Sequence, residues 1–298
     1  MQTQTETFTD KLLGFTLPGR NARARSVRLD RVINDVLSVH DYPAPVAHLL
    51  GESLVLAALM GGLLKSESDD AQLTFQAQTK TGTVSLLVCD FRGGELRGYA
   101  EFDAERLAKL GANPTLSALF GDGYLAITFE TGENQRYQGI VPLEGDTLAQ
   151  ACETYFSQSE QVPTLIRMAS SSDADGYAAA GLLIQHLPDG EEGRERLHVR
   201  MEHPDWEHVA TMAGSVSHQE LLDPNLSLEG IAWRLFHEEH EVRVQPGPAL
   251  KRGCRCNSDY YTSVIARFPE EERVHMRGED GLISVDCAFC GLTFALAL

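Results

Sequence analysis

The sequence predicts an α+β fold, with an N-terminal domain of antiparallel strands and packed helices, a helical linker and a small C-terminal module. Strand-like segments occur in runs that are separate from the helical segments, whereas strict alternation would favour a doubly wound sheet. Residues 187–249 hold 5 basic against 13 acidic side chains, while residues 250–298 hold 6 against 7 and contain four of the six cysteines. These shifts divide the chain into residues 1–186, 187–249 and 250–298.

Composition restricts the class of protein before any motif is considered. The chain has 298 residues, 43% of them hydrophobic, and a formal net charge of −18 at pH 7. Such a composition is typical of a globular protein and excludes disorder throughout. The negative charge argues against a protein that binds nucleic acid over its whole surface. Few cysteines and no recognisable secretory signal favour the reducing cytoplasm.

Two helices are expected early in the chain. Residues 26–40 carry apolar side chains at helical spacing. Residues 46–64 form the most apolar segment, but they include His48 and Glu52. A membrane-spanning helix needs about 20 nearly uncharged residues, so we expect a buried helix and no membrane segment.

Antiparallel strands should make up most of the N-terminal domain. Residues 72–79, QLTFQAQT, place their apolar side chains on one face, which is the alternation typical of a half-buried strand. A helix should begin at Asp146 or Thr147, both favoured helix N-caps, and run through Ser159. Further strands are expected at residues 83–89, 95–102, 124–129, 136–143, 164–168 and 178–185.

The acidic linker, residues 187–249, is predicted to be helical and to depend on docking for its order. Seven of the ten histidines lie between His186 and His240. Isolated helices are marginal in water, so sparse apolar side chains must hold this segment against the domain. These are Trp206, Val209, Met212, Leu221, Leu222, Ile231, Trp233 and Phe236. Such a segment is a candidate hinge or switch, and an ordinary helical connector is the alternative.

The strongest chemical signal lies in the C-terminal module, which contains a CxC and a CxxC motif separated by 30 residues. Each motif can turn two thiolates toward one metal ion, and two such pairs complete the closed tetrahedral S₄ site that zinc prefers. The sequence therefore predicts one zinc ion in this module. The predicted ligands are Cys254, Cys256, Cys287 and Cys290.

The rest of the module supports this closure. A short helix is expected over residues 259–268, and two strands over residues 282–285 and 292–296 would carry the CxxC motif at their turn. Gly253 and Gly291 flank the cysteines and give the backbone freedom to wrap an ion. A module of about 49 residues has too small a core to be secure without a staple.

Two roles are open for such a site: a permanent structural zinc knuckle, or the sensor of a redox switch. Zinc keeps bound thiols deprotonated and therefore nucleophilic toward peroxide, and Lys251, Arg252 and Arg255 would also favour thiolates. Each neighbouring pair can close on itself through a sulfenic acid, which destroys the ligands. Loss of about 10–16 kcal/mol of metal-binding free energy should then unfold the tail.

The other two cysteines lie in apolar surroundings. Cys89 ends the strand-like segment VSLLVC, and Cys152 lies in the helical segment TLAQACETYF. Cysteine in such settings usually acts as a small buried hydrophobe. We assign neither residue a functional role.

Three other functions fit parts of the sequence less well. Residues 237–241, HEEHE, miss the zinc-hydrolase spacing by one residue, which favours a solvated acidic helix end. A thiol–disulfide oxidoreductase would place CxxC at a helix start after a strand. A zinc ribbon that binds nucleic acid needs a basic face, which the tail lacks. The basic run near the N-terminus is interpreted as a solvated loop and helix face, and comprises Arg20, Arg23, Arg25, Arg28 and Arg31.

Taken together, the chain resembles the redox-regulated thirty-three-kilodalton heat-shock chaperone family of bacteria. The resemblance runs from about residue 10 to the end and includes the spaced CxC and CxxC motifs. The segments that carry it are HDYPAPVAHLLGESLVLAALM (40–60), GDGYLAITF (121–129), RYQGIVPLEGDTLAQACETYFSQSEQVPT (136–164) and AWRLFHEE (232–239).

The resemblance implies an ATP-independent holdase, not an enzyme, that binds unfolding client proteins under oxidative and heat stress. One zinc ion would be held by the four tail cysteines in the reduced, inactive form. Oxidation would form the disulfides Cys254–Cys256 and Cys287–Cys290, release the zinc and unfold the zinc domain and the linker. The active form would be a homodimer that thiol-reducing systems switch off and that passes clients to ATP-dependent foldases, with no nucleic acid or membrane involved.

Overall fold

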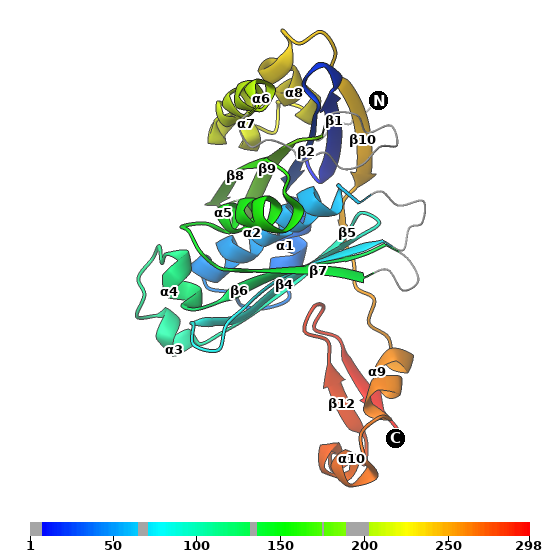
Figure 1. The fold of residues 1–298 in the computed structure, drawn as a ribbon. Coiled ribbons are helices and arrows are strands. Elements are labelled where there is room, and N and C mark those ends of the chain that lie inside the picture. Colours follow the sequence, from blue (N-terminus) through cyan, green and yellow to red (C-terminus); the bar gives the residue numbers. More distant parts are fainter. Residues whose placement is uncertain (1–7, 65–70, 132–135, 175, 189–202) are drawn as a thin grey trace, which may run out of the picture.

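The structure, a computed structural model, describes residues 8–64, 71–131, 136–174, 176–188 and 203–298. It stacks a layer of helices, a five-stranded sheet, a central helical layer and a six-stranded sheet, and a small module with a two-stranded sheet lies below them (Figure 1). Strands and helices are segregated, and the strand pairs are antiparallel except for one. The predicted α+β class is confirmed.

The six-stranded sheet has the order β11-β5-β4-β3-β6-β7. Its strands match the predicted segments closely, because one face of the sheet packs on the core and the side chains alternate as the sequence indicates. β11 was not predicted; it is two residues long and pairs in parallel with β5. The strands are β3 (Gln72–Gln78), β4 (Val84–Arg92), β5 (Glu95–Phe102), β6 (Tyr124–Glu130), β7 (Arg136–Pro142) and β11 (Lys251–Arg252).

The five-stranded sheet has the order β10-β1-β2-β9-β8. The prediction of one helix over residues 26–40 is wrong for its first residues, which belong to β2. Both faces of β2 are covered, so six of its eight residues are buried, and over residues 26–29 the alternation that identifies a strand is lost. The strands are β1 (Lys11–Leu17), β2 (Ala22–Leu29), β8 (Thr164–Asp173), β9 (Gly176–His186) and β10 (Arg243–Ala249).

The central layer between the sheets contains the long helix α2 (Ala44–Gly61), which contacts strands of both sheets. By length and composition α2 could cross a membrane, but 78% of it is buried inside the fold, as predicted for a core helix. α1 (Arg31–Leu37) and α5 (Leu148–Tyr155) lie beside it, and α5 continues into a π-helical turn (Phe156–Glu160). Three short elements complete the domain: η1 (Pro18–Arg20), α3 (Ala104–Leu107) and α4 (Leu116–Phe120).

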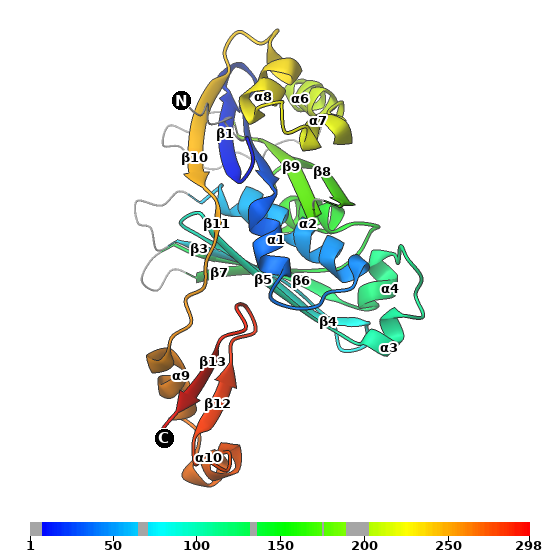
Figure 2. The same cartoon turned by 180° about the vertical axis from the view of Figure 1, so that it is seen from behind.

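In the described part of the predicted linker, residues 204–236 form three helices that cover the outer face of the five-stranded sheet (Figure 2). They are α6 (Pro204–Gly214), α7 (His218–Leu222) and α8 (Leu228–Phe236). Four predicted docking residues are buried, namely Val209, Leu221, Ile231 and Phe236. Trp206, Met212 and Leu222 are partly buried against the same cluster.

Trp233 is the exception among the predicted docking residues. Its exposed fraction is 66%, and its ring lies beside that of His237, 5.0 Å between centroids. The prediction of a helical linker is wrong for residues 243–249, which form β10 and join the domain by pairing with β1. The outer face of the five-stranded sheet is therefore covered by the helices, while its edge is extended by β10.

The C-terminal module contains the predicted helix and hairpin. The hairpin strands pair in antiparallel register from Ile283–Leu296 to Asp286–Thr293, and the CxxC motif occupies their turn. α10 was not predicted, because its charged sequence EEERVHM has no apolar stripe. The elements are α9 (Ser258–Ile265), α10 (Glu270–Met276), β12 (Ile283–Asp286) and β13 (Thr293–Leu296).

Candidate metal centre

The four tail cysteines lie together. Their Sγ atoms all lie within 4.8 Å of one another, and no other group of three or more His, Cys, Asp or Glu side chains in the described residues is placed to hold a metal ion. Three sulfur pairs are 3.3 to 3.6 Å apart: Cys254–Cys256, Cys254–Cys287 and Cys256–Cys290. Tetrahedral zinc with Zn–S bonds of ~2.3 Å requires sulfurs ~3.8 Å apart, so this donor set fits a small thiophilic ion.

Local backbone geometry explains how both pairs face one point. The CxxC turn closes through hydrogen bonds from the N–H groups of Cys290 and Gly291 to the carbonyl oxygen of Cys287. Gly291 has φ +71°, a conformation that residues with a Cβ rarely adopt. Gly253 is needed for a different reason, since a Cβ there would lie 2.7 Å from the Cβ of Glu95, an atom that a change of side-chain rotamer cannot move away.

The thiols of the cluster do not have equal proton affinities. Burial opposes ionisation of Cys287, yet hydrogen bonds from the Tyr261 hydroxyl and the N–H groups of Cys290 and Phe289 lower the pKa of Cys287 to about 6. Burial raises the pKa values of Cys256 and Cys290 above the ordinary thiol range. A cluster of this kind is acidic at one sulfur and contains groups that donate hydrogen bonds to it.

The cysteine module is docked on the N-terminal domain and does not stand alone. Nε2 of His40 lies 2.6 Å from the carbonyl oxygen of Ala288, inside the CxxC motif. On the other side, the N–H of Gly253 donates to the carbonyl of Leu96 at 2.9 Å, and Lys251 pairs with Glu95 at 3.2 Å. Both cysteine motifs are thus anchored to the domain.

Cys89 and Cys152 are apart from this cluster. Both are fully buried in the core of the N-terminal domain, which confirms the prediction that they act as small hydrophobes. Burial raises the pKa of each thiol, that of Cys89 well above its usual range. Neither side chain is placed to react with a solute in the folded protein.

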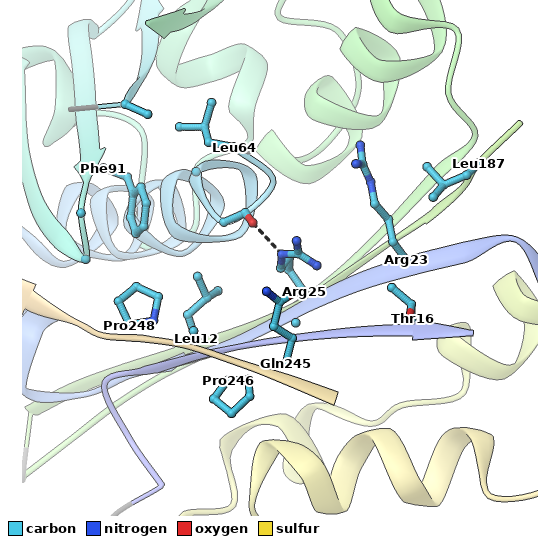
Figure 3. Close-up of a pocket in the computed structure, with 17 residues that line it drawn as sticks. Leu12, Thr16, Arg23, Arg25, Leu64, Phe91, Leu187, Gln245, Pro246 and Pro248 are labelled. Atoms are coloured by element: carbon cyan, nitrogen blue, oxygen red, sulfur yellow. Dashed lines mark hydrogen bonds between the residues drawn. The ribbon is translucent and has the colours of Figure 1, made fainter. Parts of the chain in front are cut away.

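The prediction that the N-terminal basic run is a solvated face is wrong except for Arg31, which is exposed. Arg28 is 1% exposed, and its guanidinium donates to carbonyl oxygens at and beyond the end of α7. Arg25 borders a cavity of about 690 Å³ between β1, β10 and the end of α2, and its Nε donates to the carbonyl of Gly62 at 2.6 Å (Figure 3). Arg23 donates to Gln185 at 3.0 Å. These arginines bind their own chain, because strand β2 places them between packed layers.

Residues 237–241 follow the end of α8 and are exposed, as predicted for a solvated helix end, except for Glu239. The Glu239 side chain is only 14% exposed and accepts hydrogen bonds from Arg20 and His208. Arg20 in turn pairs with Asp205 at 2.7 Å. This acidic segment therefore joins the linker to the turn between β1 and β2.

Comparison with known proteins identifies the family. A family model described as Hsp33 protein matches residues 10–297. A 33 kDa chaperonin of Caulobacter vibrioides is 38% identical over 296 residues, covering 96% of this chain and 94% of the relative. A 33 kDa chaperonin of Escherichia coli is 34% identical over 284 residues, covering 95% and 90%.

A solved structure agrees with the fold. The 33 kDa chaperonin (heat shock protein 33 homolog) of Thermotoga maritima matches with a TM-score of 0.75 at 20% identity, covering 96% of this chain and 94% of that one. The matched region therefore includes the sheet domain and most of the remaining chain. By family match and by identity to its relatives, this chain belongs to the Hsp33 family of chaperones.

Proposed function

We propose that the protein is a redox-regulated, ATP-independent holdase that binds unfolding client proteins and keeps them from aggregating. The chaperone class follows from the family. The redox control is carried by one observation: four thiols within 4.8 Å of one another lie in a module that continues directly from the linker strand. Only Leu250 separates linker strand β10 from β11. Disorder in the module would therefore loosen β10 directly.

Zinc is the proposed ion, held in the reduced state by Cys254, Cys256, Cys287 and Cys290. The donor set supports it, because four thiolates in a closed tetrahedral arrangement are typical of structural zinc. When bound, zinc would keep the thiols deprotonated and tie the CxC segment to the hairpin. Tyr261 and the backbone N–H groups of the CxxC turn hold the Cys287 sulfur in place.

Oxidation is proposed to proceed within each neighbouring pair. One thiolate attacks peroxide, its sulfur is oxidised to a sulfenic acid, and a proton completes the water that leaves. The second thiolate then displaces hydroxide from the sulfenic sulfur, and a further proton completes a second water. Each disulfide, Cys254–Cys256 and Cys287–Cys290, thus consumes one peroxide and two protons and removes two metal ligands.

Loss of the ligands is proposed to undock the linker. The small module would lose the metal ion that cross-links it. β11, and then β10, would no longer be anchored at their C-terminal ends. The helices α6 to α8 cover an apolar sheet face, so their release would expose it for capture of unfolded segments. The sheet residues of that face include Leu13, Phe15, Leu182 and Ile184.

The working cycle follows from the same chemistry. A thiol switch must begin in its reduced form, which a reducing compartment maintains, so we place the protein in the cytoplasm, where thiol-reducing systems can reverse the disulfides. The oxidised form is proposed to act as a homodimer under oxidative and heat stress, and to pass its clients to ATP-dependent foldases. Neither nucleic acid nor membrane takes part in this proposal.

Two alternatives differ in what oxidation does. A purely structural zinc knuckle would leave chaperone activity independent of the thiols. A thiol–disulfide oxidoreductase would turn over disulfides, but here CxxC occupies a hairpin turn between β12 and β13 and not a helix start after a strand. The geometry therefore favours the holdase over the oxidoreductase.

The experiment measures zinc content, free thiols and suppression of aggregation of an unrelated unfolding protein, before and after peroxide. We expect about one zinc and no protection in the reduced form. After peroxide we expect loss of zinc, four fewer thiols and protection. If the reduced, zinc-loaded form protects as well as the oxidised form, redox control is wrong even though chaperone activity stands.

A further inference from the structure

A charged cluster lies on the six-stranded sheet where the cysteine module docks. Its centre is Asp90 of β4, which is 3% exposed and accepts a 2.7 Å hydrogen bond from the Thr74 hydroxyl. Arg97 of β5 donates from Nε to the same carboxylate at 2.7 Å. Arg255, the residue between the two cysteines of the CxC motif, donates to it at 3.2 Å and to Gln72 at 3.0 Å. One buried carboxylate thus joins a sheet cation to a tail cation.

Arg97 also contacts both cysteine motifs. The Cys254 thiol lies close enough to its guanidinium to raise the pKa of Arg97. The ring of Phe289, inside the CxxC motif, lies 4.1 Å from its central carbon, the distance of a cation–π contact. The turn between β12 and β13 faces the six-stranded sheet in both views (Figures 1 and 2). A single side chain of the N-terminal domain therefore contacts the CxC and the CxxC segments together.

The charges of the two partners are complementary. Asp90, Arg97 and Arg255 together carry one positive charge in excess. Four thiolates around a divalent ion carry two negative charges, and the Arg97 guanidinium, 18% exposed, is shielded from water where the two meet. Hydrogen bonds from such outer groups to metal ligands commonly change metal affinity by about 10- to 100-fold.

We propose that Arg97, held in place by Asp90, is a positioning residue of the metal centre, so that the N-terminal domain itself helps to determine how tightly the tail holds its ion. This inference rests on the proposed tetrathiolate zinc site. Its consequence is reciprocal: bound zinc favours the docked module, and an undocked module holds zinc less tightly. Undocking by heat would then lower the metal affinity of a protein whose thiols are still reduced.

The test compares zinc affinity in full-length reduced variants by competition with a chelating dye. Arg97→Gln should weaken zinc binding by at least about tenfold. Arg97→Lys keeps the charge but loses the paired N–H donors of the guanidinium, so its zinc affinity should lie between that of Arg97→Gln and that of the unsubstituted protein. Arg136→Gln is the matched control. Arg136 lies on β7 at the other edge of the same sheet, is 67% exposed and pairs only loosely with Glu130, at 3.6 Å.

Arg97→Gln leaves the buried carboxylate of Asp90 with one cation fewer, which could destabilise the fold. A second variant avoids this problem. Asp90→Asn with Arg97→Gln replaces both charges by amides, and cooperative thermal unfolding would verify its fold. It should lose zinc affinity as Arg97→Gln does. If either variant binds zinc within about twofold of the unsubstituted protein, this inference is overturned while the proposed function stands. If the unsubstituted reduced protein binds no zinc, the proposed function fails, and this inference with it.

Discussion

Nε of Arg28 donates a 2.7 Å hydrogen bond to the carbonyl oxygen of Leu221, so a buried cation of strand β2 anchors the end of linker helix α7. The same guanidinium donates to the carbonyls of Leu226 at 2.8 Å and Glu220 at 3.3 Å. Carbonyls at a helix C-terminus lack intrahelical partners and carry partial negative charge, which suits a cation. The linker is therefore held by a specific polar anchor as well as by apolar packing.

Arg28→Met should loosen the linker without oxidation. The substitution removes three hydrogen bonds and leaves buried carbonyls unpaired, which should weaken docking by about 2–3 kcal/mol. Hydrogen exchange of residues 203–236 in the reduced protein measures this. Arg31→Met, at an exposed side chain, is the control. Equal protection in Arg28→Met and in the control would show that the anchor contributes nothing.

Phe236→Ala should expose the chaperone surface in the reduced state. Phe236 is 1% exposed, and its ring lies 5.8 Å from that of Phe15 on the covered sheet face. Removing a buried phenylalanine costs about 3–5 kcal/mol. The reduced variant should suppress aggregation with its zinc still bound. Trp233→Ala, on the exposed face of the same helix, should remain inactive until oxidised; activity in both variants or in neither would contradict the role given to docking.

The link between Glu239 and Arg20 should make linker docking depend on acid pH. Burial would raise the pKa of Glu239, yet hydrogen bonds from Arg20 and His208 hold that pKa below the ordinary glutamate value. The stabilisation is therefore fully present above about pH 4.5 and is lost as pH falls through the lower, folded value. Arg20→Gln should cost about 1 kcal/mol at pH 7 and less near pH 3.

Limited proteolysis at the two pH values checks this prediction. Arg243→Gln serves as control, because its ion pair with Glu241 is exposed and joins residues of one segment. An equal effect of Arg20→Gln at both pH values would show that the carboxylate of Glu239 is not the group responsible.

Cys89 and Cys152 should be silent in the switch. Alanine at either position should leave zinc content and peroxide response unchanged, since both thiols are fully buried and burial raises their pKa values. Cys287→Ser should instead abolish tight zinc binding. Alkylation of the native oxidised protein counts the accessible thiols. A second alkylation after denaturation counts the buried thiols, which should be those of Cys89 and Cys152. Labelling of Cys89 or Cys152 before denaturation would contradict this prediction.

Where local spacing determines structure, the sequence was sufficient. The CxC and CxxC motifs, the hairpin and the strands of the six-stranded sheet other than β11 could be predicted, because each depends on residues close together in the chain or on one buried face. The contact of Arg97 with the tail could not be predicted, because Arg97 reaches Phe289 and the CxC segment only when the module docks.

The errors have separate physical causes. β2 lies between two apolar layers, so its periodicity vanished and its arginines looked like a solvated run. Trp233 looked like a docking residue by composition, but the direction of a side chain on a short helix depends on which neighbour the helix packs against. β10 could not be predicted from its own residues, because its pairing partner β1 lies at the other end of the chain.

The central claim is that oxidation of four thiols releases the linker from the five-stranded sheet. Hydrogen exchange of α6 to α8, measured on one sample before and after peroxide and matched to its thiol count, tests it most directly. We expect the three helices to lose protection once four thiols are consumed, while α2 and the six-stranded sheet keep theirs. Unchanged protection of α6 to α8 in protein that has lost its four thiols and its zinc would contradict the account.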